Sequence, residues 1–268
     1  MTAEPFDLGR LRQELKGTRF AEGLRHFPVV DSTNVVALEA AQVGAADGSV
    51  YFADEQTAGR GRGGHGWHSA AGDGLYMSAM VRPQMALSEA LWLSLATGMA
   101  VQAAIAEVTG LCADIRWPND VVVGERKCCG VLVESAADGA GMLRHAVIGI
   151  GVNVNQQRFP ADVDGLATSL RMETGTVWPR QSVLAALLRA LDREIGLLEM
   201  EIAGVGAGEG MLERFRAASS WVCGKPVSVA EGGGYTGVTA GLDKRGYLLV
   251  RDGEGALRTV LSGGVRAR

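Results

Sequence analysis

The chain has 268 residues, of which 47% are hydrophobic and 21% charged, with a formal net charge of −4 at pH 7 and a pI near 5.7. This length can bury one large core or two unequal ones, and the acidic balance argues against broad nucleic-acid binding, which usually needs a basic surface. The four cysteines form no CxxC pair, so the sequence indicates neither a disulfide framework nor a zinc site, and the thiols fit a reducing cytoplasm.

The N-terminal region is rich in charge. The first 30 residues contain acidic and basic side chains and no continuous apolar run, so we expect no secretory signal. The most membrane-like stretch, residues 90–106, is interrupted by Ser94 and Gln102 and is short for a membrane span. We therefore expect a buried core helix there and no membrane association.

Helical periodicity predicts four helices. A short amphipathic helix is expected at residues 8–15, and residues 31–34 supply N-cap side chains for a helix that ends near Val43. Two longer helices follow, with Ser88 and Ser182 as their expected N-caps. Residues 27–30 form an apolar stretch, and strands are expected between these helices at residues 49–53, 75–81, 115–117, 121–123, 131–134 and 146–154.

The composition changes near the C-terminus. After a glycine-rich stretch at residues 204–210, short β-rich runs alternate with GGG, DKRG and DGEG turns, a spacing typical of a small β-barrel. We therefore expect two domains, a mixed helix and strand domain at residues 1–218 and a small all-β domain at residues 219–268.

The stretch GRGRGGHGW, from Gly59 to Trp67, is the strongest local signal. It holds two arginines, and no Asp or Glu occurs from Gln56 to Gly72. Glycine lets backbone N–H groups approach an anion, and arginine suits planar carboxylates and phosphates. The stretch lacks the Lys-Ser/Thr of a phosphate-binding P-loop, and no helix follows it as in a dinucleotide fold. An incidental glycine-rich surface loop remains the alternative to an anion-binding loop that orders on binding.

Two further segments add to this signal. A Pro-Asn-Asp turn such as that at residues 118–120 is common in itself, and a lysine near a turn is usually a solvated charge. Cys128 and Cys129 are expected to pack, since no Cys–His dyad is recognisable. Taken together, however, Arg60, Arg62 and Lys127 gather positive charge near an acid, Asp120. That combination suits bringing a carboxylate and a polyphosphate together.

At this point the sequence closely resembles the biotin protein ligase family. Six motifs occur in the family's order: DSTN (31–34), EQTAGRGRGGHGW (55–67), RWPND (116–120), KCCGVLVE (127–134), GIGVNVN (149–155) and ATSL (167–170). The resemblance covers the chain from about Pro28 to its C-terminus. It implies an α+β fold, with a class II synthetase-like catalytic domain of mixed sheet and helices followed by an SH3-like β-barrel.

The resemblance also implies the reaction. Biotin and ATP with Mg²⁺ would give biotinyl-5′-AMP and pyrophosphate, and a lysine of a biotin carboxyl carrier protein would then attack the adenylate and release AMP. The stretch before Asp31 is too short for the winged helix-turn-helix of the family's bifunctional repressors, so we expect the monofunctional, cytoplasmic type without operator DNA binding. It would be a monomer or a ligand-linked homodimer.

Residue roles follow from the matched motifs. The biotin-binding residues would be Ser32, Thr33, Asn34, Gln56, Arg60, Gly61, Arg62 and Lys127. The nucleotide-binding residues would be Arg60, Arg62, Trp67, Asn119 and Asn153. Lys127, Arg62 and Asp120 would act in catalysis, Lys127 by holding the biotin carboxylate or α-phosphate and Asp120 by assisting the incoming amine or an ion-linked water. No metal ligand is assigned.

One departure from the family's pattern concerns the glycine- and arginine-rich stretch from Gly59 to Trp67, called the basic loop below. Gly63 and His65 stand where many relatives carry further arginines, which leaves Arg60 and Arg62 to order the loop. Two alternative functions stay open at the level of sequence. One is a lipoate or octanoate ligase of the related fold, and the other is a non-catalytic nucleic-acid module built on the basic loop and the small barrel.

Overall fold

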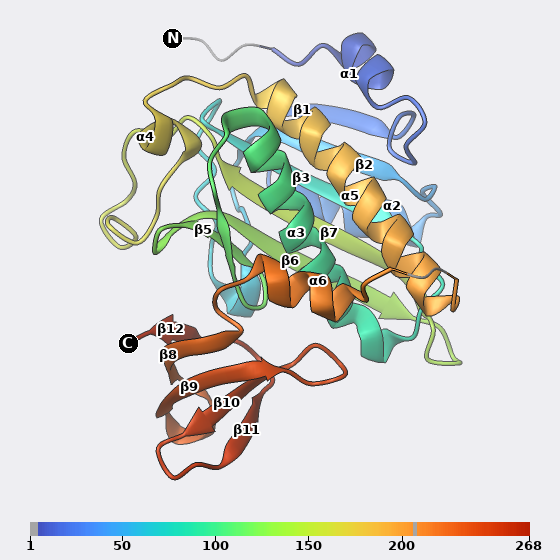
Figure 1. The fold of residues 1–268 in the computed structure, drawn as a ribbon. Helices are drawn as coiled ribbons and strands as arrows, with labels where there is room; N and C mark the ends of the chain where they lie inside the picture. The colour runs from blue at the N-terminus through green and yellow to red at the C-terminus, as the bar shows by residue number, and fades with distance from the viewer. Residues whose placement is uncertain (1–4, 206–207) are drawn as a thin grey trace.

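A mixed seven-stranded sheet forms the centre of the computed structural model, which describes residues 5–205 and 208–268 (Figure 1). Its strands are β1 (Leu24–Val30), β2 (Ser49–Gln56), β3 (Gly74–Val81), β4 (Asp114–Arg116), β5 (Asp120–Val123), β6 (Arg126–Ala137) and β7 (Leu143–Asn153). They lie in the order β1-β2-β3-β7-β6-β5-β4, with β1 parallel to β2 and every other pair antiparallel. Six of the seven overlap runs predicted as strands, and β1 contains residues 27–30, which were expected only as an apolar stretch.

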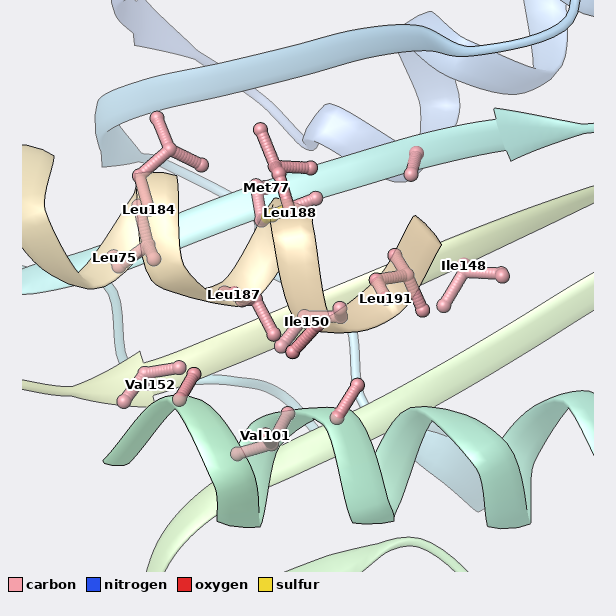
Figure 2. Close-up of a cluster of buried hydrophobic side chains, with 14 of the residues drawn as sticks. Leu75, Met77, Val101, Ile148, Ile150, Val152, Leu184, Leu187, Leu188 and Leu191 are labelled. Carbon is pink, nitrogen blue, oxygen red and sulfur yellow. The ribbon is translucent and has the colours of Figure 1, made fainter. Parts of the chain in front are cut away.

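Two long helices, α3 (Ala90–Thr109) and α5 (Arg180–Ile202), cover one face of this sheet (Figure 1). Figure 2 shows Leu184, Leu187 and Leu188 of α5 pointing at the apolar side chains of β3 and β7. The segment Leu87–Thr109, which includes α3, is the one described helix long and apolar enough to cross a membrane. Its packing against α5 and the sheet supports the predicted core helix.

The opposite face of the sheet is left partly open. Because successive strand residues point to opposite faces, Ile148 and Ile150 of β7 enter the core under α3 and α5, whereas Gly149 and Gly151 face the other side. Gly130 of β6 is the direct neighbour of Gly151. The short helix α2 (Thr33–Gln42) covers only part of this face, over β2, β3 and β7. The glycines therefore form a floor without side chains.

Both N-caps predicted for the long helices are wrong. A 3₁₀ turn, Leu87–Glu89, precedes α3, and Glu89 is the N-cap residue; its carboxylate accepts the backbone N–H of Ala86 at 3.0 Å. Pro179 precedes α5, so Ser182 lies inside the first turn. The remaining helices are α1 (Leu8–Glu14), α4 (Leu170–Thr174) and α6 (Met211–Ala218). Neither α4 nor α6 was predicted.

Five antiparallel strands form the C-terminal unit: β8 (Cys223–Val229), β9 (Tyr235–Leu242), β10 (Leu248–Asp252), β11 (Leu257–Val260) and β12 (Val265–Ala267), in the order β11-β10-β9-β8-β12. This confirms the expected SH3-like unit, although β12 was not predicted. Its apolar core is continuous with Leu95 and Ile115 of the larger unit, and the Trp117 indole donates to the Gly246 carbonyl at 2.9 Å. The glycine-rich stretch predicted to end the first unit, 204–210, lies partly outside the described residues. The boundary at residue 218 stays a prediction.

Candidate active site

A cavity of about 540 Å³ lies over the glycine floor. The RWPND turn and the last strand of the C-terminal unit form further walls. Its lining contains every residue to which the sequence gave a role: Ser32, Thr33, Asn34, Gln56, Arg60, Gly61, Arg62, Trp67, Asn119, Asp120, Lys127 and Asn153. These residues come from five of the six motifs, and Ala167 of the sixth, ATSL, also lines the cavity.

The basic loop folds back on itself as a small hairpin. Arg60 and Gly66 form an antiparallel bridge, and the N–H of Gly61 donates to the carbonyl of His65 at 2.7 Å. At the tip, Gly63 has a φ of +67°, a conformation that strongly favours glycine. An arginine at this position would be strained in this geometry. The departure from the family's pattern thus fits the local backbone.

Trp67 lies at the end of this hairpin, directly over the glycine floor. A Cβ atom at Gly151 would stand 2.4 Å from the indole ring, and one at Gly130 would stand 2.9 Å from it. The Lys127 ammonium lies 5.3 Å from the ring centroid. The buried indole N–H has no hydrogen-bond partner among the described residues, so Trp67 offers both a flat face and a free donor to a ligand.

At the other end of the cavity, four polar residues form a hydrogen-bond network. Gln56 Oε1 accepts from the backbone N–H of Thr33 at 2.9 Å. The Thr33 hydroxyl lies 2.8 Å from that of Ser78, which in turn donates to Asn34 Oδ1 at 2.5 Å. Ser32, the N-cap residue of α2, makes no side-chain capping bond. Its hydroxyl is thus available to a polar ligand beside side chains that are already fixed.

Asp120 lies between two cations. Its Oδ1 is 2.6 Å from Lys127 Nζ, and its Oδ2 is 2.7 Å from Arg116 Nη2. Burial alone would raise the pKa of Asp120, but the charges and hydrogen bonds of Lys127 and Arg116 outweigh it and hold that pKa below its usual range. The Arg116 guanidinium also lies 5.5 Å from the Trp221 ring centroid of the C-terminal segment. Asp120 therefore orients the Lys127 side chain at the cavity wall.

Arg62 lies where the basic loop meets the C-terminal unit. A Cβ atom at Gly263 would stand 3.0 Å from Arg62 Nη1 and 3.5 Å from Pro118. Burial lowers the pKa of Arg62, and the negative charges of Asp120 and Glu231 partly offset that effect. The guanidinium is thus partly desolvated, which strengthens its attraction for an anionic ligand.

Comparisons with known proteins agree with this geometry. Residues 26–153 match the Biotin/lipoate A/B protein ligase family, and residues 222–265 match the Biotin protein ligase C terminal domain. The chain is 32% identical to the bifunctional ligase/repressor BirA of Bacillus subtilis, over 91% of this chain and 74% of that protein. It is 35% identical to the biotin--[acetyl-CoA-carboxylase] ligase of Mycobacterium tuberculosis, over 91% of this chain and 89% of that one.

The chain belongs to the biotin protein ligase family. Among solved structures, the Aquifex aeolicus biotin protein ligase in complex with biotin and ATP matches with a TM-score of 0.75 at 30% identity, covering 92% of this chain and 99% of that one. The family and the fold class expected from the sequence are thereby confirmed.

The side chains of two asparagines in the site of this ligase donate hydrogen bonds to backbone carbonyls of the protein itself. Asn119 Nδ2 donates to the carbonyl of Val131 at 2.9 Å, which fixes the RWPND turn on β6. Asn153 Nδ2 donates to the carbonyl of Thr168 at 3.0 Å and to that of Lys127 at 3.4 Å. Their side chains thus hold the walls of the cavity in place, while both residues still line it.

The paired cysteines beside Lys127 are unsuited to nucleophilic chemistry. Cys128 and Cys129 are fully buried, and burial raises the pKa of the Cys128 thiol to about 12, so it stays protonated at neutral pH. Among the described residues, no group of three or more His, Cys, Asp or Glu side chains is placed to hold a metal ion. The carboxylates that line the cavity are Glu125, Asp162 and Asp120, and Asp120 is already paired with two cations. The site therefore suits a Mg²⁺ that would arrive on the phosphates of ATP and keep most of its water ligands.

Sequence reasoning missed two charged residues of this site. Arg116 pairs with Asp120, and Glu134 pairs with Arg60 at 3.0 Å. Both belong to motifs that the sequence singled out, RWPND and KCCGVLVE. The available signal was the presence of a charge inside each motif. The partner of Arg116 lies four residues away in the same motif, whereas the partner of Glu134 lies 74 residues away and cannot be read from spacing.

Proposed function

We propose that this protein is an ATP-dependent ligase that activates biotin as biotinyl-5′-AMP and transfers the biotin to a lysine of a biotin carboxyl carrier domain. The observation that carries the proposal is the layout of the cavity. A preorganised polar network lies at one end, and Lys127, Arg60 and Arg62 line the rest. This arrangement suits a ligand with a polar head group and an anionic tail. Biotin protein ligases at 32–35% identity support the same activity.

In the first half-reaction, an oxygen of the biotin carboxylate attacks the α-phosphorus of ATP, and pyrophosphate leaves. Two anions must approach each other, so the cations of Lys127 and Arg62 lower the barrier by neutralising their repulsion. Thr33 and Gln56 are positioned by each other and would hold the ureido head group together with Ser32. Mg²⁺ would enter with the triphosphate and supply further neutralisation.

In the second half-reaction, the carrier lysine amine attacks the carbonyl carbon of the mixed anhydride, AMP leaves, and the amine loses a proton. Asp120 would orient the approaching lysine. Because its pKa is held below the usual range, Asp120 is a weak proton acceptor, which favours an electrostatic role over that of a general base. The enzyme needs no covalent intermediate, in keeping with the buried, protonated thiols.

The acceptor would be the carrier domain of a biotin-dependent carboxylase, as the names of the relatives from Mycobacterium tuberculosis and Paracoccus denitrificans indicate for those proteins. We infer that the reaction takes place in the cytoplasm, where ATP and carboxylases are available and where the four free cysteines would remain reduced. Nucleic acid has no part in the proposed reaction.

The test is the exchange of labelled pyrophosphate into ATP by the purified protein with Mg²⁺. We expect exchange only when biotin is present, with octanoate and lipoate failing to support it at the same concentration. No biotin-dependent exchange in folded protein would overturn the proposal. Equal exchange with octanoate or lipoate would move the protein to the lipoate branch of the family.

A further inference from the structure

Glu134, on β6, connects the basic loop to the start of α2. Its Oε1 accepts from Arg60 Nη2 at 3.0 Å, and its Oε2 accepts from Asn34 Nδ2 at 2.8 Å. One carboxylate thus holds one strand of the loop hairpin and a nine-tenths-buried amide at the head-group end of the cavity. Glu134 is not among the residues that line the cavity. Any effect on the ligand must therefore act through its two partners.

The other strand of the loop hairpin is tied to the same network. Gln56 Nε2 donates to Ser69 Oγ at 2.8 Å, and the Ser69 hydroxyl donates to the Trp67 carbonyl at 3.1 Å. Because Gln56 is also bonded to Thr33, a continuous path of hydrogen bonds runs from Trp67 through the head-group network to Asn34 and Glu134. Both ends of the loop are thus joined through the residues proposed to bind biotin's ureido group.

Two glycines leave this path little freedom to move. A Cβ atom at Gly149 would stand 2.1 Å from Asn34 Oδ1, so the Asn34 amide lies directly on the backbone of β7. A Cβ atom at Gly59 would stand 2.7 Å from Ser69 Oγ and 2.5 Å from the Trp67 carbonyl. With such close packing, a change in one hydrogen bond must be taken up by its neighbours.

We propose that Glu134 is a positioning residue that couples the head-group end of the cavity to the basic loop. It fixes Arg60 with one oxygen and Asn34 with the other. A ureido group that bonds to Thr33 or Gln56 therefore acts on the same network that orders the loop. This inference rests on the proposed function for the identity of the ligand, but the contact between Glu134 and the loop exists without any ligand.

Glu134→Gln is the informative variant. Glutamine keeps the size of the side chain and an oxygen for Asn34, while the negative charge opposite Arg60 is lost. The matched control is Glu107→Gln, because Glu107 forms an ion pair with Arg189 at 2.6 Å, at a distance from the loop. The ion pairs Arg60–Glu134 and Arg189–Glu107 are both partly exposed. We therefore expect the loss of the charge on Glu134 to change the rate of loop cleavage only modestly, by about fivefold.

Two readouts test the coupling. In ligand-free protein, limited subtilisin digestion should cut the loop of Glu134→Gln about fivefold faster than that of wild type or Glu107→Gln, with unchanged melting temperature. In pyrophosphate exchange, KM for biotin should rise while kcat changes little. Arg60→Gln should accelerate loop cleavage to the same extent, and in this digestion readout the double variant should be no worse than either single variant.

Equal digestion of Glu134→Gln and wild type would overturn the inference, as would fully additive effects of the Glu134 and Arg60 substitutions on the rate of loop cleavage. A fall in melting temperature without faster loop cleavage would also overturn it, since Glu134 would then serve stability alone. The digestion needs no turnover. If wild type lacked biotin-dependent exchange, the proposed function would fail while the loop contact was still tested.

Discussion

The contact between Trp67 and the glycine floor yields a quantitative prediction for Gly151→Ala. The added methyl would stand 2.4 Å from the indole, about 1 Å inside ordinary van der Waals contact, so one side must move. The backbone of β7 is hydrogen-bonded to β3 on one side and β6 on the other. Trp67 belongs to a loop hairpin at the surface. We therefore expect the indole, and not the strand, to be displaced.

The expected loss of ligand affinity in Gly151→Ala is estimated from the cost of overpacking, about 1–3 kcal/mol for an added methylene-sized group. In the free protein the indole can swing away, and stability changes little. We propose that Trp67 stacks on the nucleotide in the bound state, so the cost of displacing the indole would be paid on binding and would correspond to about 5- to 150-fold in affinity. The melting temperature should stay close to that of wild type.

Calorimetric titration with a non-hydrolysable biotinyl-5′-AMP analogue measures this directly. Gly139→Ala is the control, because a Cβ atom there meets no neighbour within 4 Å. In a Trp67→Ala background, Gly151→Ala should cause no further loss. Wild-type affinity in Gly151→Ala would refute the reasoning, as would a further loss of affinity in the absence of Trp67.

Two further variants address the charged groups of the site. Lys127→Met should lower the rate of pyrophosphate exchange by about 10²- to 10³-fold, since the cation opposite the developing charge is lost; the fold should persist because Asp120 keeps its bond to Arg116, and exchange within a few-fold of wild type would exclude the role. Asp120→Asn tests how the ionisation of Asp120 contributes to the pH dependence of folding stability. The folded-state pKa of Asp120 lies below its ordinary value near 3.8, so its ion pairs stabilise the fold above that pH and the stabilisation is lost as pH falls through the folded pKa. The difference in melting temperature between wild type and Asp120→Asn should therefore shrink below about pH 3.8, and a constant difference from pH 7 to pH 3 would contradict this account.

Much of the fold follows from hydrophobic periodicity. The alternation along residues 146–154 predicted a strand, and the structure places its apolar side chains against α3 and α5. Helix starts were less predictable. Ser88 and Ser182 are good capping residues by type, yet Glu89 binds back to Ala86 and Pro179 begins the other helix. Local propensity does not decide between neighbouring caps that tertiary packing selects.

The sequence was enough to predict which residues form the candidate site, but not which of them hydrogen-bond or form ion pairs with each other. The motifs named the side chains that meet in the cavity. The pairing of Glu134 with Asn34 and Arg60 spans 100 and 74 residues along the chain. It depends on the order of β3, β7 and β6, which no local pattern reveals. Asn34 illustrates the consequence: a residue expected to bind biotin lines the cavity and is also hydrogen-bonded at both ends of its amide within the protein.

The central claim is that the cavity forms an acyl-adenylate and passes it to a lysine. The protein should be incubated with biotin and MgATP without a carrier, rapidly desalted and analysed by mass spectrometry. We predict stoichiometric, non-covalently bound biotinyl-5′-AMP, which is discharged as AMP when a biotin carboxyl carrier domain is added, with biotin then found on the carrier lysine. Consumption of ATP without bound adenylate, or biotin attached covalently to the enzyme itself, would contradict the account.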